Sequence, residues 1–323
     1  MPETVPPRIS IVVPVYRREG LIALTLQSVV DQTMRDWECI VVDDGSPDRT
    51  VAIAQQFADA DPRIRVVTHP NCGSSKTRNR GFAETNPCSE YISFMDSDDV
   101  WLPEALSVLG KALDEHPEAV GVHGLAEFID GEGKAWHPGE FAEAGRTRYG
   151  LNGNGRLRRL GVEEPTTFQT VLGTNTVYPP GVMLARRTYY DKAGPFDSTL
   201  ARMDDWDMVI RLSRLGDFHF VNKVVLLYRR HDGNISARSA LETRQVIRVL
   251  QYKSFFSPEN NEAMQEIARK VWRAWQLMII SDKLRSSREK FASGNVAAAA
   301  GLLPGILAQL YRYMRGYPTL TGL

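Results

Sequence analysis

The first 116 residues alternate between short runs of apolar, often β-branched residues and longer segments with helical spacing. The predicted strands are Ile9–Val15, Glu38–Val42, Ile64–Thr68 and Tyr91–Met95, and the helices that follow them are Glu19–Asp31, Asp48–Ala60, Ser75–Thr85 and Pro103–His116. Strands this apolar are usually buried on both faces, and their alternation with helices is typical of βαβ units. We therefore expect an α/β fold with a mostly parallel sheet flanked by helices.

The rest of the chain is less regular. Residues 130–180 are rich in Gly, Pro and Arg, show no clear period and are predicted to form loops or an insertion. A short strand at Gly181–Ala185, a helix at Asp204–Leu215 and a strand at Phe218–Tyr228 follow. The chain beyond about Ala237 is predicted to be helical. This pattern suggests one domain over residues 1–236 and a helical C-terminal extension over 237–323.

The composition is that of a globular protein, with 43% hydrophobic and 24% charged residues. The three cysteines have neither CxxC spacing nor an even number, so they indicate neither a disulfide framework nor a zinc site. Residues 1–8 have no apolar core typical of a secretory signal, and no stretch approaches the roughly 18 apolar residues of a spanning helix. We expect a cytoplasmic protein, or one bound peripherally at the inner face of the membrane.

Charge is distributed unevenly along the chain. Residues 1–235 hold 26 Lys and Arg against 33 Asp and Glu, whereas residues 236–323 hold 13 against 6. A basic helical segment with the apolar stretch Leu302–Tyr313 suggests a membrane surface or a homodimer contact, although an ordinary solvated helix face would look the same. We expect no nucleic-acid partner.

Three carboxylates follow the predicted strand Tyr91–Met95. Asp96, Asp98 and Asp99 at the end of a buried strand would repel one another and lose hydration, and a divalent cation would relieve both costs. Carboxylates completed by substrate phosphates are how Mg²⁺ or Mn²⁺ is usually held. The alternative is that Asp99 caps the helix that begins near Pro103, but a cap needs only one acceptor.

Weaker signals follow the other strands. Asp43 and Asp44 precede Gly-Ser, which is also an ordinary turn pattern. Tyr16 offers a flat ring on which a nucleobase could stack, but an aromatic residue at a strand end is more often part of the core. The cationic residues of the loop before the third helix suit either a phosphate or a solvated helix face; they are Lys76, Arg78 and Arg80.

A second acidic cluster opens the helix Asp204–Leu215. Helical spacing places Asp205 on the apolar, inward side, where its pKa should rise, so it is a candidate general base. The same spacing places Asp204 on the other side, together with Asp207 and Arg211, which are four residues apart and suit a salt bridge. His231, after the last strand, is by itself more often structural than a ligand.

Taken in order, these segments resemble family 2 of the glycosyltransferases, with the Rossmann-like GT-A fold, over about residues 8–236. The motifs that carry the resemblance are Ser10–Tyr16, Val42–Ser46, Arg78–Gly81, Asp96–Asp99 and Asp204–Asp207 with Arg211. The resemblance implies a nucleotide-sugar-binding half, about 1–100, and an acceptor-binding half, about 101–236. It also implies an inverting, metal-dependent enzyme of the hexosyl- or N-acetylhexosaminyltransferase type.

The resemblance also implies roles for individual residues. Asp96 and Asp98 match the DXD motif, which binds the metal and the donor ribose, and His231 matches a late metal-site histidine. Asp205 matches the catalytic base, and Asp204 replaces the glutamate that usually precedes it. Residues implied in binding the nucleotide are Pro14, Tyr16, Glu19, Asp44, Arg78, Asp96 and Ser97, while Lys76 stands where relatives carry a small residue.

The partners so implied are a nucleotide-sugar donor, a UDP-sugar above all, and a glycan or lipid-linked acceptor used in cell-surface polysaccharide synthesis. Mg²⁺ or Mn²⁺ is the implied cofactor. A nucleotidyltransferase of related fold would need a Gly-rich loop after the first strand, where this chain has Pro14–Arg18. A non-catalytic sugar-nucleotide-binding protein would have no need of Asp205, and a dinucleotide oxidoreductase would need GxGxxG at the first strand.

Overall fold

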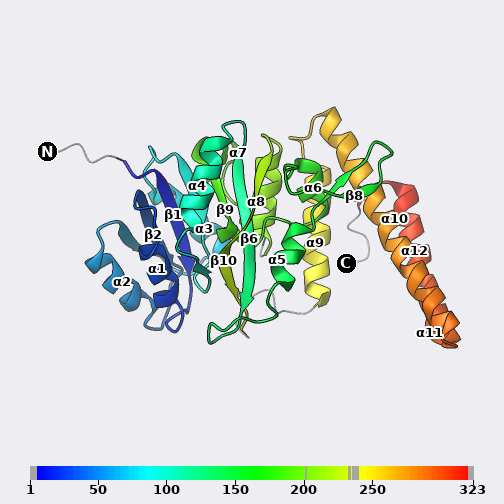
Figure 1. Ribbon diagram of the computed structural model, residues 1–323, viewed down its shortest axis with the longest axis horizontal. Helices are drawn as coiled ribbons and strands as arrows, with labels where there is room; N and C mark the ends of the chain where they lie inside the picture. Colours follow the sequence, from blue (N-terminus) through cyan, green and yellow to red (C-terminus); the bar gives the residue numbers. More distant parts are fainter. Residues whose placement is uncertain (1–5, 201, 232–233, 235–239, 319–323) are drawn as a thin grey trace.

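The computed structural model describes residues 6–200, 202–231, 234 and 240–318. Figure 1 shows a central sheet packed against helices. The C-terminal helices lie at the end of the molecule far from the N-terminus; they are α10 (Glu262–Ala292), α11 (Val296–Ala300) and α12 (Leu303–Arg315). The described helices include none that is long and apolar enough to cross a membrane.

The first part of the chain has the predicted alternation of strands and helices, with ends that differ by up to three residues from those expected. The elements are β1 (Ile9–Val15), α1 (Ile22–Val30), β2 (Trp37–Asp43), α2 (Thr50–Ala60), β3 (Ile64–Thr68), α3 (Ser74–Glu84), β4 (Tyr91–Phe94) and α4 (Ala105–Glu115). Strand β2 is buried along its whole length and β1 at six of its seven residues, which explains their continuous apolar runs.

The central sheet has eight strands in the order β3-β2-β1-β4-β9-β6-β10-β5. Its remaining strands are β5 (Val100–Trp101), β6 (Gly121–Ile129), β9 (Met183–Arg186) and β10 (Phe218–Arg229). Strands β3, β2, β1 and β4 pair in parallel, as do β6 and β10, whereas β9 runs antiparallel to both of its neighbours and β5 runs antiparallel to β10. The prediction of a mostly parallel α/β sheet is therefore confirmed.

Strand β6 has no counterpart among the predicted elements, because glycines interrupt its apolar pattern. A Cβ atom on Gly121 would lie 2.9 Å from Ala185 Cβ, and one on Gly124 would lie 2.8 Å from Val225 Cγ2. These glycines therefore let β6 fit tightly between its neighbours, although glycine ordinarily weakens a strand.

Residues 130–180 contain regular elements, which corrects the prediction of loops. They are α5 (Glu140–Arg146), β7 (Tyr149–Leu151), β8 (Leu157–Arg159) and α6 (Phe168–Gly173), after which come η1 (Pro180–Val182), β9 and α7 (Arg187–Ala193). The buried Arg148 guanidinium holds this region together by donating to the carbonyl oxygens of Glu164, at 2.6 Å, and Gly161, at 2.7 Å. Elements of three to seven residues are too short to show a period in the sequence.

The predicted helical C-terminus is confirmed. After α8 (Asp204–Ser213) and β10, the helices are α9 (Ala240–Phe255), α10 (Glu262–Ala292), α11 (Val296–Ala300) and α12 (Leu303–Arg315). Helix α10 packs closely against α6, since a Cβ on Gly173 would lie 2.0 Å from Trp275 Nε1. The division at residues 236 and 237 stays a prediction.

Candidate active site

The predicted site residues follow parallel strands at one edge of the sheet. In the parallel register, Val15 on β1 lies beside Asp43 on β2, and Val12 lies beside Phe94 on β4. The segments that leave these strands therefore begin at the same edge, where α/β sheets bind their ligands. The residues on these segments include Tyr16, Asp44, Asp96, Ser97, Asp98 and Asp99.

A buried arginine of α3 joins this edge to the start of α8. Arg78 Nη2 donates to Asp96 Oδ1 at 2.8 Å, and its Nη1 donates to Asp204 Oδ2 at 2.7 Å. Arg78 and Asp204 are 7% and 3% exposed, so these charge-assisted bonds are shielded from solvent. Two acidic motifs more than a hundred residues apart in the chain thus lie on opposite sides of one guanidinium.

Asp205 lies next to this bridge and is partly exposed. The pKa of its carboxyl is raised to about 7, first by burial and then by the charge of Asp204, while Arg78 opposes the shift. The predicted direction of the Asp205 pKa is therefore confirmed. The placement of Asp204 away from the interior is wrong, because Arg78 draws Asp204 into a more buried position than Asp205.

Asp98 is held by two groups that sequence spacing could not connect. Its Oδ2 accepts from Arg18 Nε at 3.2 Å and lies 3.1 Å from His231 Nε2. Although burial alone would raise the pKa of Asp98, the contact with His231 and the charge of Arg18 hold it below its ordinary value. Arg18 is a residue that the sequence reasoning missed, and its position just after β1 was the available signal.

Around Asp96 the negatively charged carboxylates outnumber the positively charged side chains. Burial raises the pKa of Asp96; Arg78 opposes this, and the charges of Asp98 and Asp204 add to it. A divalent cation would relieve this repulsion, and carboxylate and imidazole donors suit Mg²⁺ or Mn²⁺. By donor chemistry, Asp96, Asp98 and His231 fit such an ion.

These three donors are not all gathered in one place. Among the described residues, the three-ligand group whose donor atoms lie within 4.8 Å of one another is Asp44, His69 and Cys72. In contrast, Asp98 and His231 are in contact while Asp96 is turned toward Arg78. One or two protein carboxylates with phosphate oxygens suffice for Mg²⁺, so the Asp98–His231 pair is the preformed part of the set.

Asp99 has a structural role instead of the helix cap considered from the sequence. It is 0% exposed, and its Oδ1 accepts from the Arg229 backbone N–H at 3.1 Å. Burial raises its pKa well above the ordinary range. Arg229 Nε in turn donates to the Asp98 carbonyl at 3.0 Å. The segment after β4 is thereby fixed to the end of β10.

Asp43 and Asp44 accept hydrogen bonds from the backbones of two different loops. Asp43 Oδ2 accepts from the N–H groups of Gly45 and Ser46, at 3.0 and 2.9 Å, which is the turn expected from the sequence. Asp44 accepts through Oδ1 from Cys72 N–H at 2.7 Å and through Oδ2 from Gly73 N–H at 3.0 Å. Asp44 therefore shapes the loop before α3, and its role in binding the nucleotide stays a prediction.

The remaining predicted nucleotide-binding residues lie on β1 or on the segments that follow β1 and β4. The Tyr16 side chain is 40% exposed and so is not part of the core. Glu19 accepts from the Arg49 N–H at 3.0 Å. Pro14 lies within β1, and Ser97 is buried at 7% exposure.

Of the three cationic residues near α3, Arg78 alone reaches the carboxylate cluster. Lys76 and Arg80 are exposed. Arg80 pairs with Glu84 at 2.7 Å, one helical turn along. The structure thus separates the two alternatives left open by the sequence, with a solvated face for Arg80 and Lys76 and a site position for Arg78.

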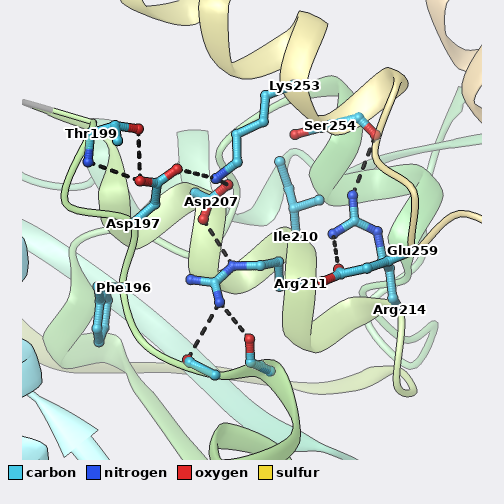
Figure 2. Close-up of polar contacts among 12 residues, drawn as sticks. Phe196, Asp197, Thr199, Asp207, Ile210, Arg211, Arg214, Lys253, Ser254 and Glu259 are labelled. Atoms are coloured by element: carbon cyan, nitrogen blue, oxygen red, sulfur yellow. Dashed lines mark hydrogen bonds and ion pairs between the residues drawn. The ribbon is translucent and has the colours of Figure 1, made fainter.

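A separate, structural set of charges surrounds Asp207 of α8, as Figure 2 shows. The predicted Asp207–Arg211 salt bridge is present at 2.9 Å. Asp207 also accepts from Lys253 Nζ on α9 at 2.7 Å, and Lys253 donates to Asp197 at 2.6 Å. This network ties α9 to α8 and to the segment before it.

The aperiodic region contributes residues that the sequence reasoning did not single out. Tyr178 Oη lies 2.6 Å from Tyr228 Oη. Burial and then the neighbouring Tyr228 hydroxyl raise the pKa of Tyr178, and the charges of Asp205 and Asp96 add smaller contributions. Just before it come three buried side-chain oxygens that have no hydrogen-bond partner among the described residues. They belong to Thr174, Asn175 and Thr176.

The architecture and the acidic edge are those of a GT-A glycosyltransferase. The family model described as "Glycosyl transferase family 2" matches residues 10–194, so the chain belongs to that family. Chondroitin synthase of Pasteurella multocida is 26% identical over 239 residues, which cover 74% of this chain and 22% of that protein. This chain spans less than half the length of the curated relatives it matches.

Solved structures agree with this fold. S. aureus TarS 1–349 in complex with UDP-GlcNAc superposes with a TM-score of 0.62 at 19% identity, over 83% of this chain and 72% of that one. The mannosyltransferase PcManGT from Pyrobaculum calidifontis, in complex with GDP-Man and Mn²⁺, gives a TM-score of 0.58 at 17% identity, over 97% and 83%. These similarities show the GT-A fold with helices at its C-terminal end.

Proposed function

We propose that this chain transfers a sugar, with inversion, from a UDP-sugar to an acceptor hydroxyl. The observation that carries the proposal is the Arg78 bridge, which gathers the residues after β4 and those at the start of α8 around one cluster of carboxylates. Both partners of a transfer reaction could then meet there. The relative solved with UDP-GlcNAc supports a UDP-linked donor, of the hexosyl or N-acetylhexosaminyl type.

The donor would lie along the edge formed by β1, β2 and β4. The exposed ring of Tyr16 offers a face for the base, and Asp44 would accept a hydrogen bond from the base. Arg78 would approach the diphosphate. When bound by Asp98 and His231, with Asp96 nearby, Mg²⁺ or Mn²⁺ would offset the negative charge of the diphosphate leaving group. The Mn²⁺ in the mannosyltransferase complex supports this assignment.

Asp205 would accept the proton of the acceptor hydroxyl. Its neighbour Asp204 is engaged by Arg78, so Asp205 is the carboxylate of the pair that can face an incoming hydroxyl. The acceptor oxygen, as it loses its proton to Asp205, would attack the anomeric carbon on the face opposite the diphosphate, which inverts the configuration. A base whose pKa lies near neutral pH, as that of Asp205 does, suits this step.

The acceptor would approach from the region around Tyr178. The buried side-chain oxygens of Thr174, Asn175 and Thr176 have no hydrogen-bond partner among the described residues. They would accept hydrogen bonds from the hydroxyl groups of a glycan or of a lipid-linked sugar that displaces the atoms covering them. Similarity to chondroitin synthase supports an acceptor in polysaccharide synthesis.

The test is calorimetry with a panel of nucleotide sugars, run with and without Mn²⁺, followed by a transfer assay on glycan and lipid-linked acceptors. We expect metal-dependent binding of a UDP-sugar and release of UDP. A protein that binds the donor but never releases UDP in the presence of any acceptor would be a sugar-nucleotide-binding protein. Release of pyrophosphate from a nucleoside triphosphate would indicate a nucleotidyltransferase.

A further inference from the structure

Helix α12 presents a row of large apolar side chains to solvent. Leu303, Leu307, Leu310 and Met314 are 51%, 65%, 37% and 70% exposed. Their spacing of three and four residues places them on one side of the helix. Tyr311, at 59% exposed, lies at the border of the same side. Isolated exposed apolar residues are ordinary, but a continuous row is not.

Helix α10 carries a second such row. Leu277, Leu284 and Phe291, each seven residues apart, are 39%, 41% and 65% exposed. Residues seven apart lie on nearly the same side of a helix, because seven residues make about two turns. Figure 1 shows α10 and α12 side by side.

The two helices pack antiparallel through neighbouring positions. Gln276 on α10 contacts Gln309 on α12, and further along α10 Lys283 donates to the Gly305 carbonyl at 3.2 Å. The contact positions therefore run up one helix and down the other. On α12 the buried residue Ile306 belongs to the same contact side as Gln309.

Each exposed row is shifted by one residue from the contact side. Leu277 and Leu284 follow Gln276 and Lys283, while Leu310 follows Gln309. One residue is a rotation of about 100°. Because the helices are antiparallel, the same shift on each turns both rows toward the same side of the pair. The seven side chains, which we call the tail face, therefore form one apolar surface: Leu277, Leu284, Phe291, Leu303, Leu307, Leu310 and Met314.

Charges around the tail face are mostly positive. Arg288 is exposed and lies within about 40° of Leu284 on the helical wheel of α10. The acidic residues of α10 beyond Gln276 are Asp282 and Glu289, and their wheel positions lie roughly opposite Leu284. Helix α12 contains no acidic residue, and Arg315 lies about 80° from Leu307 on its helical wheel, whereas Arg312 lies on the other side of the helix beside Gln309.

We propose that the tail face docks onto an anionic lipid surface, with its apolar side chains entering the boundary between headgroups and acyl chains. Apolar residues beside cationic ones are the combination that binds such an interface. A second copy of the chain would instead bring identical cationic residues toward one another, which anionic headgroups would not. The proposal does not depend on the proposed donor or acceptor.

Co-sedimentation of the full chain with vesicles tests it. We expect sedimentation with vesicles of phosphatidylcholine containing about a third phosphatidylglycerol, and little with pure phosphatidylcholine. The double variant Leu307→Glu with Met314→Glu should bind the anionic vesicles more than about tenfold more weakly, because two apolar contacts are lost. Arg288→Gln should lower binding to the anionic vesicles by a smaller factor. Added salt should also weaken vesicle binding by the wild-type protein.

The matched control is Leu24→Glu, the same type of substitution at a residue on α1 that is 49% exposed. It should bind vesicles like the wild-type protein, and circular dichroism should show that all variants are folded. Equal sedimentation of the double variant and the wild type would overturn the proposal. So would a wild-type protein that stays in the supernatant, including one that light scattering shows to be a dimer disrupted by the double variant.

Discussion

Two clusters of charge include acidic side chains of helix α8, and they differ in how their charge is balanced. In the first, Asp207 is matched by Arg211 and Lys253, and Lys253 also pairs with Asp197 (Figure 2). In the second, Asp204 and Asp205 lie with Asp96 around Arg78. The first cluster is electrically complete, whereas the second has more carboxylates than cations.

The difference separates stability from chemistry. Buried charges that serve only the fold are usually paired, since an unpaired one is costly. An excess of one sign persists where a ligand or ion supplies the rest. The four residues Asp204–Asp207 thus contribute both to stability and to chemistry. Substitutions in the Asp207 cluster and in the Arg78 cluster should have opposite consequences.

The largest expected effect is on transfer by Asp205→Asn. Loss of a general base costs on the order of a thousandfold in kcat, while UDP-sugar binding should stay within about twofold because the amide keeps the shape of the carboxyl group. Release of UDP in the presence of acceptor measures the first quantity, and calorimetry measures the second. Full activity in this variant would refute the assignment. Asp204→Asn is the comparison that tests which member of the pair is the base.

The sequence predicts one of these clusters better than the other. Spacing along α8 suffices to pair Asp207 with Arg211, because both lie on the same helix. The Arg78–Asp204 contact joins residues 126 apart in the chain. It depends on how α3 packs relative to α8, and no local pattern contains that information. The periodicity argument therefore misplaced Asp204 while giving the correct pKa direction for Asp205.

The same limit applies to the fold. The continuous apolar runs of β1 and β2 identify the parallel half of the sheet directly. Strand β6 is not evident from the sequence because Gly121 and Gly124 interrupt its apolar pattern. Both positions need glycine because the neighbouring strands leave no room for a Cβ atom. Arg148 looks like a surface residue in the sequence, yet the folded chain surrounds it with carbonyl acceptors.

Asp207→Ala should destabilise the fold without changing the chemistry. Removing one member of a buried pair leaves its partners uncompensated and costs about 3 kcal/mol. Lys253 and Arg211 would both lose a carboxylate. Urea unfolding measures the free energy, and kcat per folded molecule should be unchanged. The matched control is Glu132→Ala, whose partner Lys134 is largely exposed, and there the change should be below about 0.5 kcal/mol.

Asp98→Ala should weaken metal-dependent donor binding by about tenfold to a hundredfold. The carboxylate is lost from its contacts with His231 and Arg18, while the base Asp205 is untouched. Calorimetry with a UDP-sugar, with Mn²⁺ and then with EDTA, measures the effect. The variant should differ from wild type only when metal is present. An equal loss in EDTA would show that Asp98 acts through Arg18 and not through an ion.

The smallest effect is on thermal stability, and its sign at pH 8 differs between the two acidic clusters of α8. The folded-state pKa of Asp205 is raised to about 7 from 3.8. A carboxyl group with a raised pKa favours folding at low pH and loses that contribution as the pH rises from about 4 through 7. Without metal, Asp205→Asn should therefore have a higher Tm than wild type at pH 8 and a similar Tm at pH 4. Asp207→Asn should have a lower Tm at pH 8, since a neutral amide cannot form the ion pairs with Arg211 and Lys253. Thermal melts across this pH range compare the two directly, and a destabilised Asp205→Asn at pH 8 would mean that the charge around Arg78 is already balanced without an ion.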